Sequence, residues 1–179
     1  MHLPKLAALA ASAALAMGAA AAIAPAANAS VDSSHTYRIT TQGSLALDVS
    51  GGSRGDGAAV IQWPVNGGAN QSWRVVDLPD GYQQLRNVNS GKCLTLGYPG
   101  SPGNPGTGIT QWVCGSSLNQ EWAVDPDTVN NYGNYLIYSG LQNGAAVDVP
   151  GGTGNWGTQL IGWPFSHGLN QNFHLTVVG

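Results

Sequence analysis

Four kinds of side chain recur together at two places in this sequence, and their chemistry suits reversible binding. Both sets run in the order Asp, Trp, Asn, Gln, and they consist of Asp48, Trp63, Asn70 and Gln71, and of Asp148, Trp163, Asn170 and Gln171. In each set 23 residues separate the Asp from the Gln. An ionised carboxylate can accept hydrogen bonds from two hydroxyl donors, and an aromatic face offers apolar area with little entropy to lose.

Compared with these two binding sets, the sequence offers few residues that could act in catalysis. Glu121 is the only Glu of the chain, and it falls at the variable position of a repeated motif, where we expect it to face solvent. A glycosidase with paired carboxylates therefore has no evident acid. His35, His167 and His174 fall at unmatched positions of the repeats, so we expect no metal set among them. We expect a protein that is not an enzyme and that carries no metal or cofactor.

Both sets belong to a longer pattern that occurs three times. The motif Asn-Gln-x-aromatic stands at residues 70–73, 119–122 and 170–173, so successive copies lie 49 and 51 residues apart. A Trp stands ten residues before each final aromatic, at Trp63, Trp112 and Trp163. A near-constant period over most of a chain indicates a repeat architecture. The three final aromatics, Trp73, Trp122 and Phe173, are then expected to be equivalent core residues.

Each repeat contains four short β-rich runs separated by Gly, Asn, Asp and Pro. The twelve predicted strands are 37–40, 45–49, 59–63, 73–78, 83–88, 93–96, 109–113, 122–124, 135–138, 146–149, 159–163 and 173–178. Propellers typically need four to eight blades to close, so three units favour a closed barrel. The sequence thus predicts an all-β fold, a β-trefoil of three four-stranded repeats (about 37–81, 82–131 and 132–179) with pseudo-threefold symmetry.

The first 29 residues have the features of an export signal. A short basic start is followed by an Ala- and Leu-rich apolar run, and Ala27-Asn28-Ala29 precedes a predicted cut at Ser30. A retained membrane anchor is the alternative, since the run reaches the lower edge of spanning length. Beyond it we expect a short leader at 30–36, one domain at 37–179 and no membrane span, and the protein is expected to be secreted.

The charged residues of the chain argue against a nucleic-acid partner. Removal of the signal takes away Lys5, one of six Lys and Arg, and leaves five scattered basic residues against nine Asp and Glu. Nothing there neutralises a phosphate backbone, so we expect no nucleic-acid partner.

The two cysteines, Cys93 and Cys114, lie in one repeat of an exported chain, which favours a disulfide.

These residues resemble a known family, the ricin B-chain-type lectins. The resemblance is carried by the Gln-x-Trp repeats, by Leu47-Asp48-Val49 and Val147-Asp148-Val149, and by the Trp-Pro pairs at Trp63 and Trp163, and it covers about residues 37–178. Similar modules occur as carbohydrate-binding modules on secreted glycosidases. The resemblance implies that glycans or polysaccharides are the partners.

The resemblance also implies a role for each residue of the two sets. Asp48 would accept hydrogen bonds from two neighbouring sugar hydroxyls, Asn70 would add amide contacts, Trp63 would stack on the pyranose ring, and Gln71 would hold the Asp carboxylate. In the third repeat the same roles fall to Asp148, Asn170, Trp163 and Gln171. The plainer alternatives are that the two Trp residues belong to the core and that each Asp caps a local turn.

The second repeat departs from the family pattern. Thr95 replaces the Asp, and the separation from this position to Gln120 grows to 25 residues. Without the carboxylate the strong charge-assisted acceptor is absent, so Trp112, Asn119 and Gln120 are expected to be structural. Two residues before each Trp, where galactose-binding members often carry Gln, this chain has Ile61, Thr110 and Ile161, which argues against simple galactose specificity.

Two classes of function therefore remain. The first is a secreted lectin that recognises galactose-type or related pyranose sugars through the first and third repeats. The second is a protein-binding trefoil, such as a protease inhibitor or a toxin-like partner binder, in which the Gly- and Pro-rich loop 97–108 would meet a protein partner.

Overall fold

The structure is a computed structural model that describes residues 31–129, 133–141 and 143–179. The predicted export signal at 1–29 lies outside these residues. Within the described part, no helix is long and apolar enough to cross a membrane. Residues 31–35 precede the first strand and contact the barrel, where Val31 is buried in the core and its carbonyl accepts a hydrogen bond from Gln83 Nε2 (3.1 Å).

All twelve predicted strands are present, with boundaries within one or two residues of those expected. They are β1 Thr36–Thr41, β2 Leu45–Val49, β3 Ala58–Pro64, β4 Ser72–Asp77, β5 Gln83–Asn87, β6 Cys93–Leu96, β7 Ile109–Trp112, β8 Trp122–Pro126, β9 Tyr135–Ser139, β10 Ala145–Asp148, β11 Ile161–Pro164 and β12 Phe173–Val177. In the described residues, five single-turn 3-10 helices lie between the strands, namely η1 Ser50–Gly52, η2 Ala69–Gln71, η3 Leu118–Gln120, η4 Pro150–Gly152 and η5 Leu169–Gln171. The chain is all-β.

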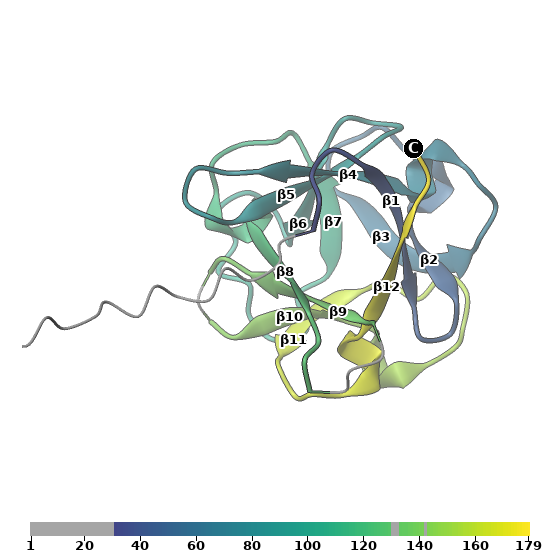
Figure 1. The fold of residues 1–179 in the computed structure, drawn as a ribbon. Helices are drawn as coiled ribbons and strands as arrows, with labels where there is room; N and C mark the ends of the chain where they lie inside the picture. Colours follow the sequence, from purple (N-terminus) through teal and green to yellow (C-terminus); the bar gives the residue numbers. More distant parts are fainter. Residues whose placement is uncertain (1–30, 130–132, 142) are drawn as a thin grey trace, which may run out of the picture.

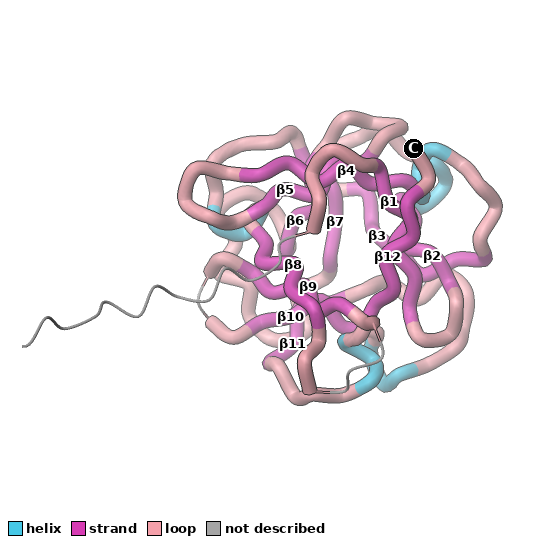
Figure 2. The backbone as a smooth tube through the Cα atoms, in the orientation of Figure 1, coloured by secondary structure: helices cyan, strands magenta, loops and turns pink. Residues whose placement is uncertain are grey.

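Six of the strands close into a barrel. β1 pairs with β4, β4 with β5, β5 with β8, β8 with β9, β9 with β12, and β12 with β1, all antiparallel. The colours in Figure 1 show successive parts of the chain following one another around this barrel, and Figure 2 shows the strands gathered centrally with the loops outside. Closure pairs the edges that an open sheet would expose, and the arrangement is consistent with the expected β-trefoil.

The other six strands form three hairpins, β2–β3, β6–β7 and β10–β11, that share one register. The residue opposite the repeated Trp is Ala46 in the first hairpin, Cys93 in the second and Ala146 in the third. Two residues further along, Asp48 faces Ile61, and Asp148 faces Ile161. The hairpins therefore place the two Asp residues in equivalent positions.

The final aromatics of the three motifs lie in the core, as expected. Trp73, Trp122 and Phe173 are at most 1% exposed. The Trp73 indole donates to the Leu47 carbonyl, and the Trp122 indole donates to the Leu94 carbonyl, both at 3.0 Å. A buried indole N–H needs such a partner. Each Trp thereby ties a barrel strand to the hairpin of its own repeat.

The expected disulfide joins Cys93 of β6 to Cys114, which follows β7. The two Cα atoms lie 5.0 Å apart, and no described cysteine is free. The bridge closes the base of the second hairpin, whereas the first and third repeats carry Ala46 and Ala146 opposite the Trp and have no such link.

Glu121 is buried beside the start of β8. The expectation that Glu121 faces solvent is wrong: it is only 6% exposed, and its Oε2 is buried with no hydrogen-bond partner among the described residues. The turn at Gly140 covers it, since a Cβ added there would lie 3.0 Å from the Glu121 Cβ and Gly140 N–H donates to the Glu121 carbonyl (2.7 Å). Burial raises the pKa of the Glu121 carboxyl, and the neighbouring Asp80 raises it further.

This burial predicts that Glu121→Gln stabilises the protein at neutral pH by about 1 kcal/mol. A carboxyl with a raised folded-state pKa favours folding while protonated, so its contribution is complete below its ordinary value of 4.5 and is lost as the pH rises. The neutral amide avoids that loss and can donate to Asp80. Chemical denaturation at neutral and acid pH should show a gain for the variant only at neutral pH; a variant less stable at neutral pH would contradict the account.

Candidate functional site

The first set of residues surrounds one cavity on the β2–β3 hairpin. Asp48 near the end of β2 and Trp63 on β3 line it together with Asn70, and the cavity measures about 500 Å³. The 3-10 turn η1 forms another wall through Ser50, Gly51 and Gly52. Gly51 and Gly52 have φ values of 63° and 61°, a conformation that residues with a Cβ rarely adopt. The two glycines let the backbone turn sharply beside Asp48.

Gln71 holds the Asp48 carboxylate in place. Its Nε2 donates to Asp48 Oδ2 (2.8 Å) and to the Pro64 carbonyl (2.9 Å), while its Oε1 accepts from the Asn66 N–H (2.9 Å). Gln71 is 1% exposed. Both ends of its amide are thus committed within the protein, so Gln71 positions the Asp.

The third set builds an equivalent arrangement. Gln171 Nε2 donates to Asp148 Oδ2 (2.9 Å) and to the Pro164 carbonyl (3.1 Å). Asp148, Trp163 and Asn170 line a cavity of about 340 Å³, in which the turn η4 takes the place of η1. The structure therefore brings together all four predicted residues in each of the two repeats.

The two Asn residues lie at the cavities but are partly engaged by the backbone. Asn70 Nδ2 donates to the Val49 carbonyl, and Asn170 Nδ2 donates to the Val149 carbonyl, both at 3.2 Å. Asn170 also donates to Asp148 Oδ2 (2.8 Å). Each Asn thus ties the turn after the Asp strand to the 3-10 turn that carries it.

One oxygen of each Asp is held by the protein and the other is not. The side-chain hydrogen bonds from Gln71, Gln171 and Asn170 all reach Oδ2. Among the described residues no donor reaches Oδ1 of Asp48 or Asp148, although both carboxylates line cavities. Each carboxylate therefore keeps one oxygen without a donor from the described protein, in an Asp that lines a cavity and is only 4% (Asp48) or 3% (Asp148) exposed.

Burial and hydrogen bonding have opposite effects on the pKa of the Asp48 and Asp148 carboxyls. Burial raises the pKa of Asp48, and the neighbouring side-chain amides of Gln71 and Asn70 lower it by less. The same balance raises the pKa of Asp148, with Gln171 and Asn170 as the opposing donors.

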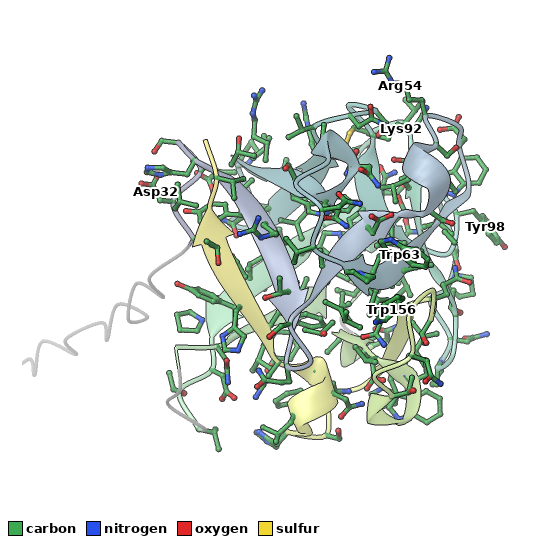
Figure 3. The ribbon with its side chains drawn as sticks, turned by 90° about the vertical axis from the view of Figure 1, so that its right-hand side faces the viewer. Asp32, Arg54, Trp63, Lys92, Tyr98 and Trp156 are labelled. Carbon is green, nitrogen blue, oxygen red and sulfur yellow. A yellow bond between two sulfur atoms is a disulfide. The ribbon has the colours of Figure 1, made fainter. Side chains whose placement is uncertain are left out.

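The aromatic residues at the cavities are surface residues. Trp63 is 40% exposed and Trp163 is 45% exposed, whereas Trp73, ten residues after Trp63, is fully buried. Figure 3 shows Trp63 near the surface on the face toward the viewer. The alternative that Trp63 and Trp163 are core residues is therefore wrong, and each cavity has an aromatic face at its edge.

The second repeat uses the same positions for internal contacts. Gln120 Nε2 donates to Thr95 Oγ1 (3.0 Å), and the Thr95 hydroxyl donates to the Cys93 carbonyl (2.9 Å). Asn119 is 1% exposed and donates to the carbonyls of Leu96 (2.9 Å) and Tyr98. The end of β6 and the start of the loop 97–108 thus accept the hydrogen bonds of the Asn119 amide, which agrees with its expected structural role.

The sequence did not show how the repeats interlock. Gln62, one residue before Trp63, is 1% exposed and donates through Nε2 to the carbonyls of Thr153 (2.7 Å) and Asn155 (2.9 Å). Gln111 makes the equivalent bonds to the carbonyls of Ser53 and Gly55, each at 2.9 Å. Both Gln residues therefore connect neighbouring repeats. The turns after the Asp strands were also missed, although their signal, Gly-Gly two residues after each Asp-Val, is present at 51–52 and 151–152.

Comparison with known proteins agrees with this geometry. The family model described as "Ricin-type beta-trefoil lectin domain-like" matches residues 27–112. Sequence comparison with curated proteins gives no match. A designed threefold-symmetric protein, ThreeFoil, is 33% identical in sequence with a TM-score of 0.73, over 82% of this chain and 100% of that protein.

Two natural proteins of similar structure act on or bind carbohydrate. A ricin B-like lectin from Macrolepiota procera, solved in complex with lactose, is 26% identical with a TM-score of 0.67, over 81% of this chain and 96% of that one. An exo-β-1,3-galactanase from Clostridium thermocellum is 30% identical with a TM-score of 0.73, but the match spans 80% of this chain and only 30% of the enzyme. The family match, the closed barrel and the repeated Gln-x-aromatic core together place this chain in the ricin-type β-trefoil lectin-like family.

Proposed function

We propose that this protein is a non-enzymatic lectin that binds galactose-type or related pyranose sugars at two sites, one at Asp48 and one at Asp148. The observation that carries the proposal is the state of the two carboxylates. Each has Oδ2 held by a buried Gln and Oδ1 left available beside a half-exposed Trp. Two neighbouring sugar hydroxyls can donate to such a carboxylate, while the apolar face of the pyranose covers the indole.

The relatives support a carbohydrate ligand, and the hairpin register bears on which sugar it is. Lactose, the ligand of the Macrolepiota procera lectin, carries a terminal galactose. In this chain the residues opposite the two Asp are Ile61 and Ile161. These side chains cannot hydrogen-bond a hydroxyl, so recognition of the sugar falls to the Asp, the Asn and the turn after the Asp strand. A range of related pyranoses is then accommodated.

The proposal also includes the repeat boundaries of the chain and its export from the cell. We assign the repeats to about 37–81, 82–131 and 132–179, related by a pseudo-threefold axis, and we infer that the chain is exported with cleavage before Ser30. The Cys93–Cys114 disulfide supports an oxidising compartment. N-terminal sequencing of the exported protein should begin at Ser30, and a chain that retains Met1 would contradict the cleavage.

A glycan array followed by calorimetric titration tests the proposed function. Single shallow sites should bind monosaccharide in the millimolar range, about −4 kcal/mol, and two sites on one chain should gain through avidity on a polyvalent glycan. Galactose, lactose and arabinoxylan-type oligosaccharides are suitable first ligands. Thr95→Ala is a matched control, because it alters the equivalent position of the second repeat and should leave binding unchanged. The absence of binding to every glycan on the array would overturn the proposal.

Binding is also expected to weaken as the pH falls. The acceptor role of Asp48 and Asp148 needs the ionised form, and the pKa of both carboxyls is raised above the ordinary 3.8, chiefly by burial. The midpoint of the loss should therefore lie above 3.8. A raised folded-state pKa favours the folded protein at acid pH, so these two groups do not unfold the protein there. Titrations from neutral to acid pH measure the midpoint, and a midpoint at or below 3.8 would contradict the assigned role.

A further inference from the structure

Each hairpin Trp has a loop from another repeat beside it, and the three contacts follow one pattern. The residue before the Trp accepts a backbone hydrogen bond from a glycine of that loop. Gly157 N–H donates to the Gln62 carbonyl (2.9 Å), Gly57 N–H to the Gln111 carbonyl (2.8 Å) and Gly106 N–H to the Gly162 carbonyl (2.8 Å). These bonds place Gly157 beside Trp63, Gly57 beside Trp112 and Gly106 beside Trp163.

The residue before each of these glycines differs among the repeats. It is Trp156 at the first hairpin, Asp56 at the second and Pro105 at the third. Asp56 is occupied, since its Oδ1 accepts from Lys92 Nζ (2.7 Å) and from the Val113 N–H (2.9 Å). Pro105 has no aromatic ring. Among these three described loops, the residue before the glycine is therefore aromatic only at the first candidate site.

Trp156 is exposed and lies directly beside Trp63. It is 66% exposed, and its ring centroid is 6.2 Å from that of Trp63, with 60° between the ring planes. Figure 3 shows the two residues next to each other on the face toward the viewer. The described residues that line the cavity at Asp48 include Trp63 and do not include Trp156. The second indole therefore extends the surface beyond the place of the sugar that Asp48 would hold.

The loop that carries Trp156 is fixed on both sides to β3. The Gln62 amide donates to the carbonyls of Thr153 and Asn155 before the Trp, and Gln62 N–H donates to the Thr158 carbonyl (2.9 Å) after it. Gly157 adopts a φ of 79°, and a Cβ at that position would lie 3.7 Å from the Trp63 ring. The backbone of Trp156 is thus held close to Trp63, which limits the entropy that binding would cost.

We propose that Trp156 forms a second subsite next to the Asp48 site, so that this site takes an oligosaccharide, whereas the Asp148 site takes a single terminal sugar. The proposal rests on the proposed function. One pyranose would bind at Asp48 and Trp63, and the next sugar of the same chain would cover the Trp156 indole with its C–H face. An indole offers a large apolar area with few rotamers to lose, so the subsite should strengthen binding of longer ligands about tenfold.

The test measures each site separately with two lengths of one sugar. Asp148→Ala leaves the first site alone and Asp48→Ala leaves the third, and each is titrated with galactose and with a β-linked galactotriose. In the Asp148→Ala protein the trisaccharide should bind about tenfold more tightly than galactose. Adding Trp156→Ala should remove that difference and change galactose binding less than about twofold. In the Asp48→Ala protein the same change should have no effect.

Trp156→Phe keeps an aromatic face and serves as the conservative variant. It should retain most of the preference for the trisaccharide, which separates stacking from a general role in holding the loop. If Asp148→Ala binds both ligands but Trp156→Ala leaves their ratio unchanged, the subsite is wrong and the lectin function stands. If the unaltered protein binds neither these two ligands nor any other glycan, both proposals fail.

Discussion

Replacement of both candidate Asp residues should abolish carbohydrate binding while the fold is retained. In Asp48→Ala, Asp148→Ala each site loses the acceptor oxygen that lies beside its Trp. A hydrogen bond to a charged group contributes about 1.5–3 kcal/mol, and each carboxylate is expected to accept two. An affinity that begins near millimolar should therefore fall at least a hundredfold, below what calorimetry detects. Each single variant should keep one site and halve the stoichiometry.

The control for this experiment is a variant that keeps the shape of the side chains. Asp48→Asn, Asp148→Asn preserves volume but removes the charge and one acceptor. It should bind as poorly as the Ala variant, with thermal unfolding that shows an intact fold. Loss of the negative charge is then the cause. Unchanged sugar binding in the double Asn variant would contradict the assignment of the carboxylates.

Removal of the disulfide should destabilise the barrel but spare the binding of sugar. The bridge closes a loop with a sequence separation of 21 residues, which stabilises by about 3 kcal/mol in the loop-entropy model. Cys93→Ala, Cys114→Val introduces the residues that the first repeat carries at these positions, Ala46 and Val65. Chemical denaturation of this variant should therefore show a loss of about 3 kcal/mol in the free energy of unfolding.

Titration of the same variant with sugar separates stability from function. Both candidate sites lie in repeats that lack the bridge, so affinity at a temperature where the variant is folded should equal that of the unaltered protein. A loss of binding in the folded variant would indicate that the second repeat takes part in recognition. A change in unfolding free energy well under 1 kcal/mol would contradict the stabilising role.

The fold was largely predictable because its signals are local and repeated. Short β-rich runs bounded by Gly, Asn and Pro fixed the twelve strands, and the aromatic at the end of each motif marked the core at Trp73, Trp122 and Phe173. The pairing of Cys93 with Cys114 followed from the presence of only two cysteines. Each of these inferences needed the sequence of one repeat and its comparison with the other two.

The features that escaped prediction depend on contacts between distant segments. Glu121 is buried because the turn at Gly140 covers it, and nothing adjacent in the sequence indicates that contact. Nothing near Gln62 in the sequence indicates that its amide binds the carbonyl of Thr153, 91 residues away. Trp156 reaches Trp63 through the same interlock. Such contacts cannot be predicted from the sequence of one repeat, because the residues that make them come together only in the folded barrel.

Nuclear magnetic resonance of the six tryptophan indole N–H groups tests the central claim most directly. If sugar binds at Asp48 and Asp148, the Trp63 and Trp163 signals should move as a bound glycan such as lactose is added, and both movements should be absent in the double Asp variant. The core signals of Trp73 and Trp122 and the signal of Trp112 should remain in place. A response confined to Trp112, or movement of Trp63 and Trp163 that persists in the double variant, would contradict the two-site account.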